Sequence, residues 1–243
     1  MTPAGVSWRE QPFEAGFLGG PVWRLTLSAG ADGAGLARAL ERMAGARLIA
    51  CRIGDADEAA AGLLAAAGFR AIETLVTYSR PIEAEPAPEF GDGVGLAGAG
   101  DRGSCVDIGR SAFLFDRFHA DPRLDDGAAS ALKGAWVDNG FAGRADAIVV
   151  ARRDGRARGF VLCQKPDADT AVIDLIATAP GHQGRGLGRA LVLGTLAHYR
   201  GRARVLRVGT QDANTASRRL YEATGFEPVG RHRTFHWTPP LPT

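Results

Sequence analysis

The stretch from Asp174 to Gly194, DLIATAPGHQGRGLGRALVLG, decides how the second half of this chain folds. An apolar run ends there at a turn, and glycines crowd the residues just before a helix-like pattern. A strand that enters a helix through such a turn leaves several backbone N–H groups without partners, where the helix dipole is positive. Because glycine lets the backbone close on a bulky anion, the stretch predicts a cradle for a phosphate or diphosphate.

Two common nucleotide-binding motifs do not explain this stretch. A P-loop needs the pattern GxxxxGK[ST], which the chain lacks. A Rossmann fingerprint needs GxGxxG after the first strand of a βαβ unit, whereas Gly184, Gly186 and Gly188 lie late in the chain and are followed by Arg189. Neither the P-loop nor the Rossmann fold therefore accounts for the predicted anion cradle.

The segments around the glycine turn alternate between strand-like and helix-like patterns. An apolar run over 170–178 predicts a buried strand. Two further strands are predicted around the turn at Asp154 and Gly155. The remaining expected elements are helices over 101–113, from 125, over 184–199 and over 214–225, and strands over 203–211 and 227–237. This order, ααβββαβαβ, predicts a mixed α/β sheet.

Composition narrows the classes of partner. The 243 residues are 45% hydrophobic and 23% charged with a net charge of +2, which favours neither nucleic acid nor membrane as a partner. No apolar run approaches the ~18 residues of a membrane span, and the first residues do not resemble a signal peptide. The three cysteines lack a CxxC spacing, as expected of free thiols in a reduced cytoplasmic protein. His232 and His236 lack further ligands nearby, so no metal site is expected.

The segment IEAEPAPEFGDG, residues 82–93, is rich in Pro, Glu and Gly and predicts a linker. It separates a short segment, residues 1–81, from residues 94–243, which are enough for a full domain core. The short segment repeats three blocks of the longer one in the same order. DGAGLARAL at 32–40 aligns with QGRGLGRAL at 183–191, and ARLIACRI and AAGLLAAAGF align with blocks further along.

The second segment resembles the GNAT acetyltransferase superfamily. Gln183-x-x-Gly186-x-Gly188 is similar to its acetyl-CoA loop, and Asn214, Tyr221 and the Gly225-Phe226 pair match its second signature. The resemblance implies a GNAT fold, with a mixed, mostly antiparallel central sheet flanked by helices. Residues 109–140 and the opening of the chain also resemble bacterial dTDP-fucosamine and related amino-sugar N-acetyltransferases.

Within this resemblance the short first segment is expected to be a degenerate, incomplete GNAT-like half-domain. Asp32 stands in place of Gln183, and its negative charge would repel a phosphate. Leu64 replaces Tyr221. We therefore expect a structural module that binds no coenzyme A.

Acetyl-CoA is the co-substrate that the resemblance implies. Backbone groups at the end of the 170–178 strand would pair with its pantetheine arm, and the glycine turn with two arginines would hold its phosphates. The residues expected to bind it are Ile176, Ala177, Thr178, Gln183, Gly184, Arg185, Gly186, Leu187, Gly188, Arg189, Asn214 and Tyr221.

In the family signature Tyr221 is the general acid that protonates the departing thiolate. The base that deprotonates the acceptor amine is left open between Asp174, His119 and a chain of waters. Arg117, His119, Arg123 and Gln211 are candidate acceptor-binding residues.

The expected reaction is direct acetyl transfer, in a ternary complex, to a primary amine. The favoured acceptor is the 4-amino group of a nucleotide-linked amino-dideoxy sugar. Another amine, such as a protein N-terminus, a polyamine or an antibiotic, is one alternative, and a non-catalytic acyl-CoA sensor is the other. Dimerisation through a sheet edge would fit the superfamily, although no patch in the sequence requires it.

Overall fold

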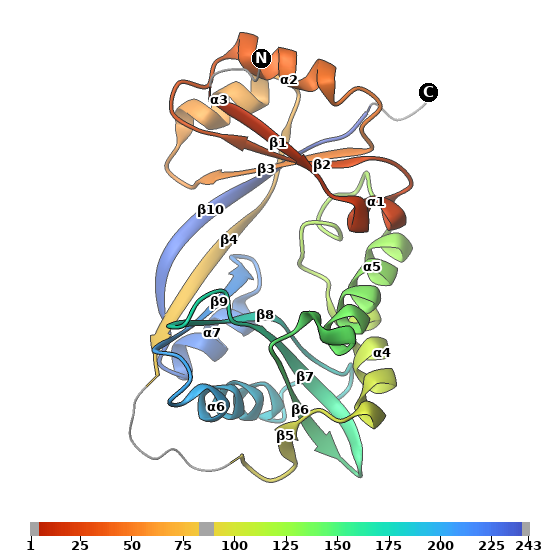
Figure 1. Cartoon of the computed structure of the whole chain (residues 1–243), viewed down its shortest axis with the longest axis vertical. Coiled ribbons are helices and arrows are strands. Elements are labelled where there is room, and N and C mark those ends of the chain that lie inside the picture. Colours follow the sequence, from red (N-terminus) through yellow and green to blue (C-terminus); the bar gives the residue numbers. More distant parts are fainter. Residues whose placement is uncertain (1–4, 83–89, 240–243) are drawn as a thin grey trace.

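A computed structural model describes residues 5–82 and 90–239 of the chain. Its strands form one ten-stranded sheet in the order β1-β2-β3-β10-β4-β9-β8-β7-β6-β5 (Figure 1). The strands are β1 (Val6–Glu10), β2 (Val22–Leu27), β3 (Leu48–Gly54), β4 (Arg70–Pro81), β5 (Val94–Leu96), β6 (Ala147–Arg153), β7 (Arg156–Gln164), β8 (Thr170–Thr178), β9 (Val205–Gln211) and β10 (Glu227–Trp237).

Helices cover both faces of this sheet (Figure 1). Apolar clusters place α2, α3, α6 and α7 on one face and α1, α4 and α5 on the other. Their bounds are α1 (Pro12–Leu18), α2 (Gly33–Arg42), α3 (Glu58–Ala66), η1 (Ala99–Asp101), α4 (Arg102–Ala112), α5 (Asp126–Asn139), η2 (Gly140–Arg144), α6 (Leu187–Tyr199) and α7 (Thr215–Ala223).

Of the nine strand pairs in the described residues, β2–β3 and β8–β9 are parallel and the other seven are antiparallel. The expectation of a mixed, mostly antiparallel sheet flanked by helices is confirmed. Strands β8 and β10 have the predicted bounds, whereas α6 begins three residues later than expected because the glycines before Leu187 are not helical. Strand β5 was not predicted, since three residues are too short for a periodic signal.

The first and second segments of the chain interleave one strand each at the centre of the sheet. Strand β4, from the first segment, lies between β9 and β10, and β10, from the second, lies between β3 and β4. Each strand is antiparallel to both of its neighbours. The sheet therefore runs without a break through both predicted domains. Of the predicted linker, residues 83–89 lie outside the described residues.

Each half of the sheet has its own apolar core. One is built by β3, α2 and α3, and includes the fully buried Leu36 and Leu64. The other is built by β8, β9, α6 and α7. Tyr78 of β4 belongs to this second core, so the first segment of the chain completes the packing of the second.

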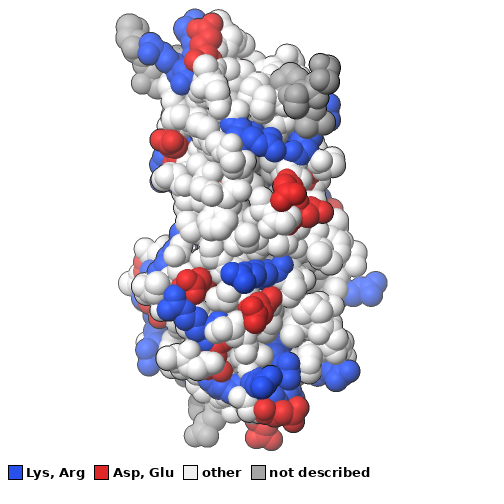
Figure 2. Space-filling view, turned by 90° about the vertical axis from the view of Figure 1, so that its right-hand side faces the viewer, with Lys and Arg blue, Asp and Glu red and all other residues white. Residues whose placement is uncertain are grey.

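Charged side chains of both signs are interspersed over the face that α4 and α5 cover, with no broad patch of one sign in that view (Figure 2). None of the described helices is both long and apolar enough to cross a membrane. The described residues hold no cluster of three or more His, Cys, Asp or Glu side chains suited to a metal ion.

Candidate active site

The turn between β8 and α6 is open at its glycines. Gly181, Gly184 and Gly186 have φ angles of +77°, +71° and +80°, in a region that residues with a Cβ atom rarely adopt. A Cβ added at any of the three would meet no heavy atom within 4 Å. These glycines are therefore required by the backbone conformation of the turn and not by close packing. The space beside the turn is open.

The N-terminus of α6 carries no side-chain cap. Gly186 is the N-cap residue, and the first backbone bond of the helix runs from the Ala190 N–H to the Gly186 carbonyl. The N–H groups of residues 186–189 precede that bond and point out of the helix at its positive end. Arg185 and Arg189 are exposed beside them and form no ion pair with another described residue. This end of α6 has the geometry and the charge of an anion site.

Gly188 serves a different purpose from the glycines of the turn. A Cβ at this position would lie 3.1 Å from Cδ2 of Leu220, which is tighter than ordinary packing. Its missing side chain lets the first turn of α6 approach α7. The turn thereby sits close to the helix that carries Tyr221.

Strands β8 and β9 separate beside this turn. They pair only where 170–173 meets 205–208, after which β9 continues along β4. Ile176, Ala177 and Thr178 remain paired with β7 on one side. On the side toward β9 they have no strand partner among the described residues. Their backbone groups therefore form a free strand edge that leads to the glycine turn.

Tyr221 lies on α7 in the same apolar core as Ile176 of β8 and Leu187 of α6, and it is 1% exposed. Its ring packs against Tyr78 and Phe226, each with its centroid 5.8 Å away. Burial raises the pKa of its phenol above the ordinary value, so the group stays protonated at neutral pH. Its hydroxyl makes no hydrogen bond with any other described residue and is left available to a ligand.

Asn214 begins the helix that carries Tyr221. Its side-chain oxygen accepts a hydrogen bond from the Ser217 N–H at 3.1 Å, which caps α7. This cap sets where α7 starts and so fixes the position of Tyr221 two turns later.

Asp174 sits at an irregularity in β8. The register of β7 and β8 shifts by one residue between Leu162 and Cys163, opposite Asp174. The indole N–H of Trp136 on α5 donates to Asp174 Oδ2 at 3.0 Å, so the carboxylate faces the side of α4 and α5. It is partly exposed there.

Both ring nitrogens of His119 are engaged. Nδ1 lies 2.6 Å from Asp116 Oδ2, and Nε2 lies 3.2 Å from Ser130 Oγ. Lys133 shares the Asp116 carboxylate at 3.7 Å, and burial lowers the pKa of its amine. To act as a base, His119 would have to exchange Ser130 for a substrate or a water.

Arg117 and Arg123 also have protein partners. Arg117 forms an ion pair with Glu14 at 2.7 Å. Arg123 binds both oxygens of Asp121, at 2.8 Å each, and donates to the His236 carbonyl. Although burial alone would raise the pKa of Asp121, hydrogen bonds from His236 and Arg123 hold it below the ordinary value. These contacts tie the 113–125 segment to α1 and β10.

Gln211 ends β9 on the sheet face that carries Leu75 and Glu73. Leu75 is its direct partner, and Glu73 is two residues further along β4. Glu73 was not singled out from the sequence, and neither was Trp136. Glu73 faces this site only because β4 inserts beside β9, and no local pattern in the sequence reveals that insertion.

The three cysteines are free and buried. Burial raises the pKa of each thiol to about 12, so none is a thiolate nucleophile near neutral pH.

Comparison with known proteins identifies the part of the chain that carries this site. Residues 113–226 match the model of the acetyltransferase (GNAT) family. These residues form a GNAT acetyltransferase domain. Enzymes of the GNAT family use acetyl-CoA as their co-substrate.

Relatives and solved structures agree with this domain. The chain is 29% identical over 141 residues to the spore coat polysaccharide biosynthesis protein SpsD of Bacillus subtilis, covering 58% of this chain and 48% of that protein. It is 30% identical over 200 residues to a mycothiol acetyltransferase of Thermomonospora curvata, covering 80% and 65%. The chain thus spans about half to two thirds of the length of these relatives. A GCN5-related N-acetyltransferase of Sphaerobacter thermophilus shares the fold, with a TM-score of 0.64 and 17% identity over 98% of this chain and 79% of that one.

Proposed function

We propose that this chain transfers an acetyl group from acetyl-CoA to the primary amine of a small acceptor. The observation that carries the proposal is the free edge of β8, which ends at the uncapped N-terminus of α6. A pantetheine arm laid along the edge would bring its diphosphate to the N–H groups of residues 186–189. Arg185 and Arg189 stand beside these groups and would add charge to that grip.

The transfer requires an acid and a base on opposite sides of the reacting carbon. As the amine nitrogen attacks the thioester carbonyl, the C–S bond breaks and the thiolate takes a proton from the Tyr221 hydroxyl. The acylated nitrogen then loses its second proton, which returns through solvent to the Tyr221 oxygen and leaves a neutral amide. Asp174, His119 or a chain of waters takes the proton that the acceptor ammonium must lose. The Trp136 indole holds the Asp174 carboxylate in place, which makes it the better oriented of the two side chains.

The favoured acceptor is a nucleotide-linked amino-dideoxy sugar. The similarity to SpsD, a polysaccharide biosynthesis protein, supports this choice. Another small amine is the second candidate, because the similarity to a mycothiol acetyltransferase extends over more of the chain.

Three free, buried cysteines support a reduced cytoplasmic setting. The edge strands β1 and β5 are where a second copy would extend the sheet.

A thiol-release assay with a panel of amines tests the function. The panel contains a nucleotide-linked amino sugar, the same sugar without its nucleotide, a polyamine and a peptide N-terminus. We expect coenzyme A release to be fastest with the nucleotide-linked sugar, and the acetylated amine to be recovered. Turnover with a different amine alone would select the second candidate. Binding of acetyl-CoA without release for any amine would instead identify a sensor.

A further inference from the structure

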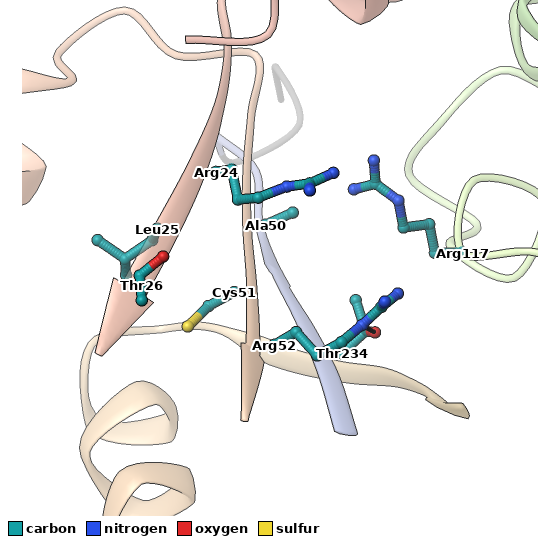
Figure 3. A pocket seen from close by; sticks show the side chains of 8 residues that line it. All are labelled: Arg24, Leu25, Thr26, Ala50, Cys51, Arg52, Arg117 and Thr234. Carbon is teal, nitrogen blue, oxygen red and sulfur yellow. Dashed lines mark hydrogen bonds between the residues drawn. The ribbon is translucent and has the colours of Figure 1, made fainter. Parts of the chain in front are cut away.

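The first segment of the chain contains a hollow of about 120 Å³ in which three arginines converge. Arg24, Arg52 and Arg117 point into it from two strands and a loop (Figure 3). Since a water molecule occupies ~30 Å³ in the liquid, the volume suits one small polar group rather than a whole ligand. We call this hollow the arginine pocket.

Strand register explains why these side chains meet. Arg24 of β2 is paired with Ala50 of β3, and Arg52 is two residues beyond Ala50, so both arginines lie on one sheet face. Thr234 of β10 is the direct partner of Arg52 and lines the same pocket. Arg117 closes it from the 113–125 segment, which packs over this face.

The positive charge of the arginine pocket is only partly neutralised. Arg52 lies 3.4 Å from Glu73, and Arg117 lies 2.7 Å from Glu14. Arg24 forms no ion pair or hydrogen bond with any other described residue. Arg24 is exposed to solvent at the mouth of the pocket, and its guanidinium faces that of Arg117, so two like charges lie close together (Figure 3). A bound anion would relieve that repulsion.

The two glutamates that flank the arginine pocket are also incompletely paired. Oε2 of Glu14 and Oε2 of Glu73 are buried and have no hydrogen-bond partner among the described residues. A buried carboxylate oxygen without a donor is costly, so each is suited to a ligand hydroxyl. The pocket therefore offers donors for an anion, and each of the two arginines that has an ion pair shares it with a carboxylate that is itself only half paired.

The arginine pocket lies on the same sheet face as Gln211, a candidate acceptor-binding residue of the proposed active site. Arg52 reaches Glu73, and Glu73 is two residues from Leu75, the strand partner of Gln211. At ~3.3 Å per residue along a strand, Glu73 and Leu75 are about 7 Å apart. A ligand anchored at the pocket could thus extend along β4 toward β9.

We infer that Arg24, Arg52 and Arg117 bind a phosphate-class anionic group carried by the acetyl acceptor. This inference rests on the proposed function and assigns a task to the first segment, which recognises the acceptor while the GNAT domain holds acetyl-CoA. The guanidinium forks of three arginines match the oxygens of a phosphate or diphosphate. An acceptor without an anionic group would bring no counter-charge to Arg24.

The test uses the full chain saturated with coenzyme A, which occupies the α6 site, and thymidine diphosphate as the probe. Arg24→Ala is the informative variant because Arg24 holds no other described residue in place. Arg38→Ala is the matched control, since Arg38 is exposed on α2, which packs against the opposite sheet face. Thermal melting of both variants verifies that they remain folded.

We expect Arg24→Ala to weaken calorimetric binding of the probe roughly ten- to hundredfold and to raise KM for a nucleotide-linked acceptor by a similar factor. Arg38→Ala should change neither quantity, and acetyl-CoA affinity should be the same in all three proteins. Unchanged probe binding in Arg24→Ala would overturn the inference. So would weakened probe binding with an unchanged acceptor KM, because the anion would then not belong to the acceptor.

Failure of the proposed function gives a different result. A chain that binds the probe through Arg24 but acetylates no amine lacks the proposed activity, and the acceptor-borne part of the inference falls with it. If Arg24→Ala acetylates amines as well as the unchanged chain does, the proposed function stands. The inference that Arg24 binds an anion of the acceptor is then wrong.

Discussion

The two halves of the sheet are built on the same plan but differ at the start of one helix. The first half runs β2-α2-β3-α3-β4 and the second β8-α6-β9-α7-β10. In each, two parallel strands flank the first helix, and the last strand crosses to the centre of the sheet. The half-repeat predicted from the sequence therefore corresponds to two units of matching topology.

The first helices of the two units differ in what caps their N-terminal backbone N–H groups. Asp32 caps α2, and its carboxylate accepts a hydrogen bond from the Gly35 N–H at 2.6 Å. Gly186 begins α6 and offers no side chain. One helix thus carries its own anion, whereas the other presents the same groups to solvent. The contrast shows how one capping carboxylate decides whether the first N–H groups of a helix are satisfied within the chain or left open to an anion.

The second helix of each unit shows a parallel difference. Leu64 on α3 and Tyr221 on α7 are both fully buried against their own cores. Leu64 offers only apolar contact, whereas Tyr221 adds a hydroxyl without a partner among the described residues. The first unit therefore has neither an uncapped first helix nor a tyrosine at the matching place on its second, and its opposite sheet face carries the arginine pocket.

Removing the first unit should have the largest effect. A chain of residues 94–243 lacks β4, so β9 loses a neighbour, and Tyr78 no longer packs against Tyr221. We expect this fragment to be unfolded or aggregated when measured by circular dichroism and gel filtration. A soluble, active fragment would contradict the interdependence of the two units.

Tyr221→Phe should lower kcat by roughly 10²- to 10⁴-fold, because the phenyl ring keeps the packing but cannot protonate a thiolate. Steady-state kinetics and acetyl-CoA calorimetry measure the two consequences, and affinity should be preserved. The matched change in the first unit, Leu64→Ala, should instead cost about 2–5 kcal/mol of unfolding free energy with kcat unchanged in the folded fraction. Near-normal turnover of Tyr221→Phe would remove its assignment as the acid.

Gly186→Asp should give α6 the kind of cap that Asp32 gives α2. Its carboxylate would compete with the diphosphate for the N–H groups, and we expect acetyl-CoA affinity to fall roughly ten- to hundredfold. Gly186→Asn is the control, since asparagine tolerates a positive φ equally well without the charge. Equal affinities for the two variants, measured by calorimetry, would show that charge at this position does not matter.

Asp32→Ala should have the smallest effect. Loss of the α2 cap is expected to cost ~1 kcal/mol, or a fall of about 2–4 °C in Tm, with kinetic constants unchanged. Thermal melting checks the stability. A gain of a second acetyl-CoA site in this variant would mean that the cap alone had closed the cradle in the first unit.

Much of the fold followed from local patterns in the sequence. The apolar run of β8 and the strand-like composition of β10 gave the bounds of both strands. The glycine turn indicated where α6 starts, although the positive φ angles of Gly184 and Gly186 delay the helix to Leu187. The roles assigned to Tyr221, Asp174 and the turn residues stay predictions.

The exchange of β4 and β10 could not be predicted in the same way. Which strand lies next to β9 depends on contacts between residues more than 100 positions apart, such as Leu75 and Gln211, and no local periodicity encodes them. The arginine pocket escaped notice for the same reason. Arg117 was a candidate acceptor-binding residue, but Arg24 and Arg52 resemble surface arginines until strand register and the 113–125 segment bring the three together.

A crystal structure of the full chain soaked with acetyl-CoA tests the central claim most directly. The account predicts one molecule per chain, with its pantetheine arm along residues 176–178 and its diphosphate against the N–H groups of residues 186–189, and none at the start of α2. A map with the α6 turn empty, or with the cofactor bound against Asp32, would contradict it.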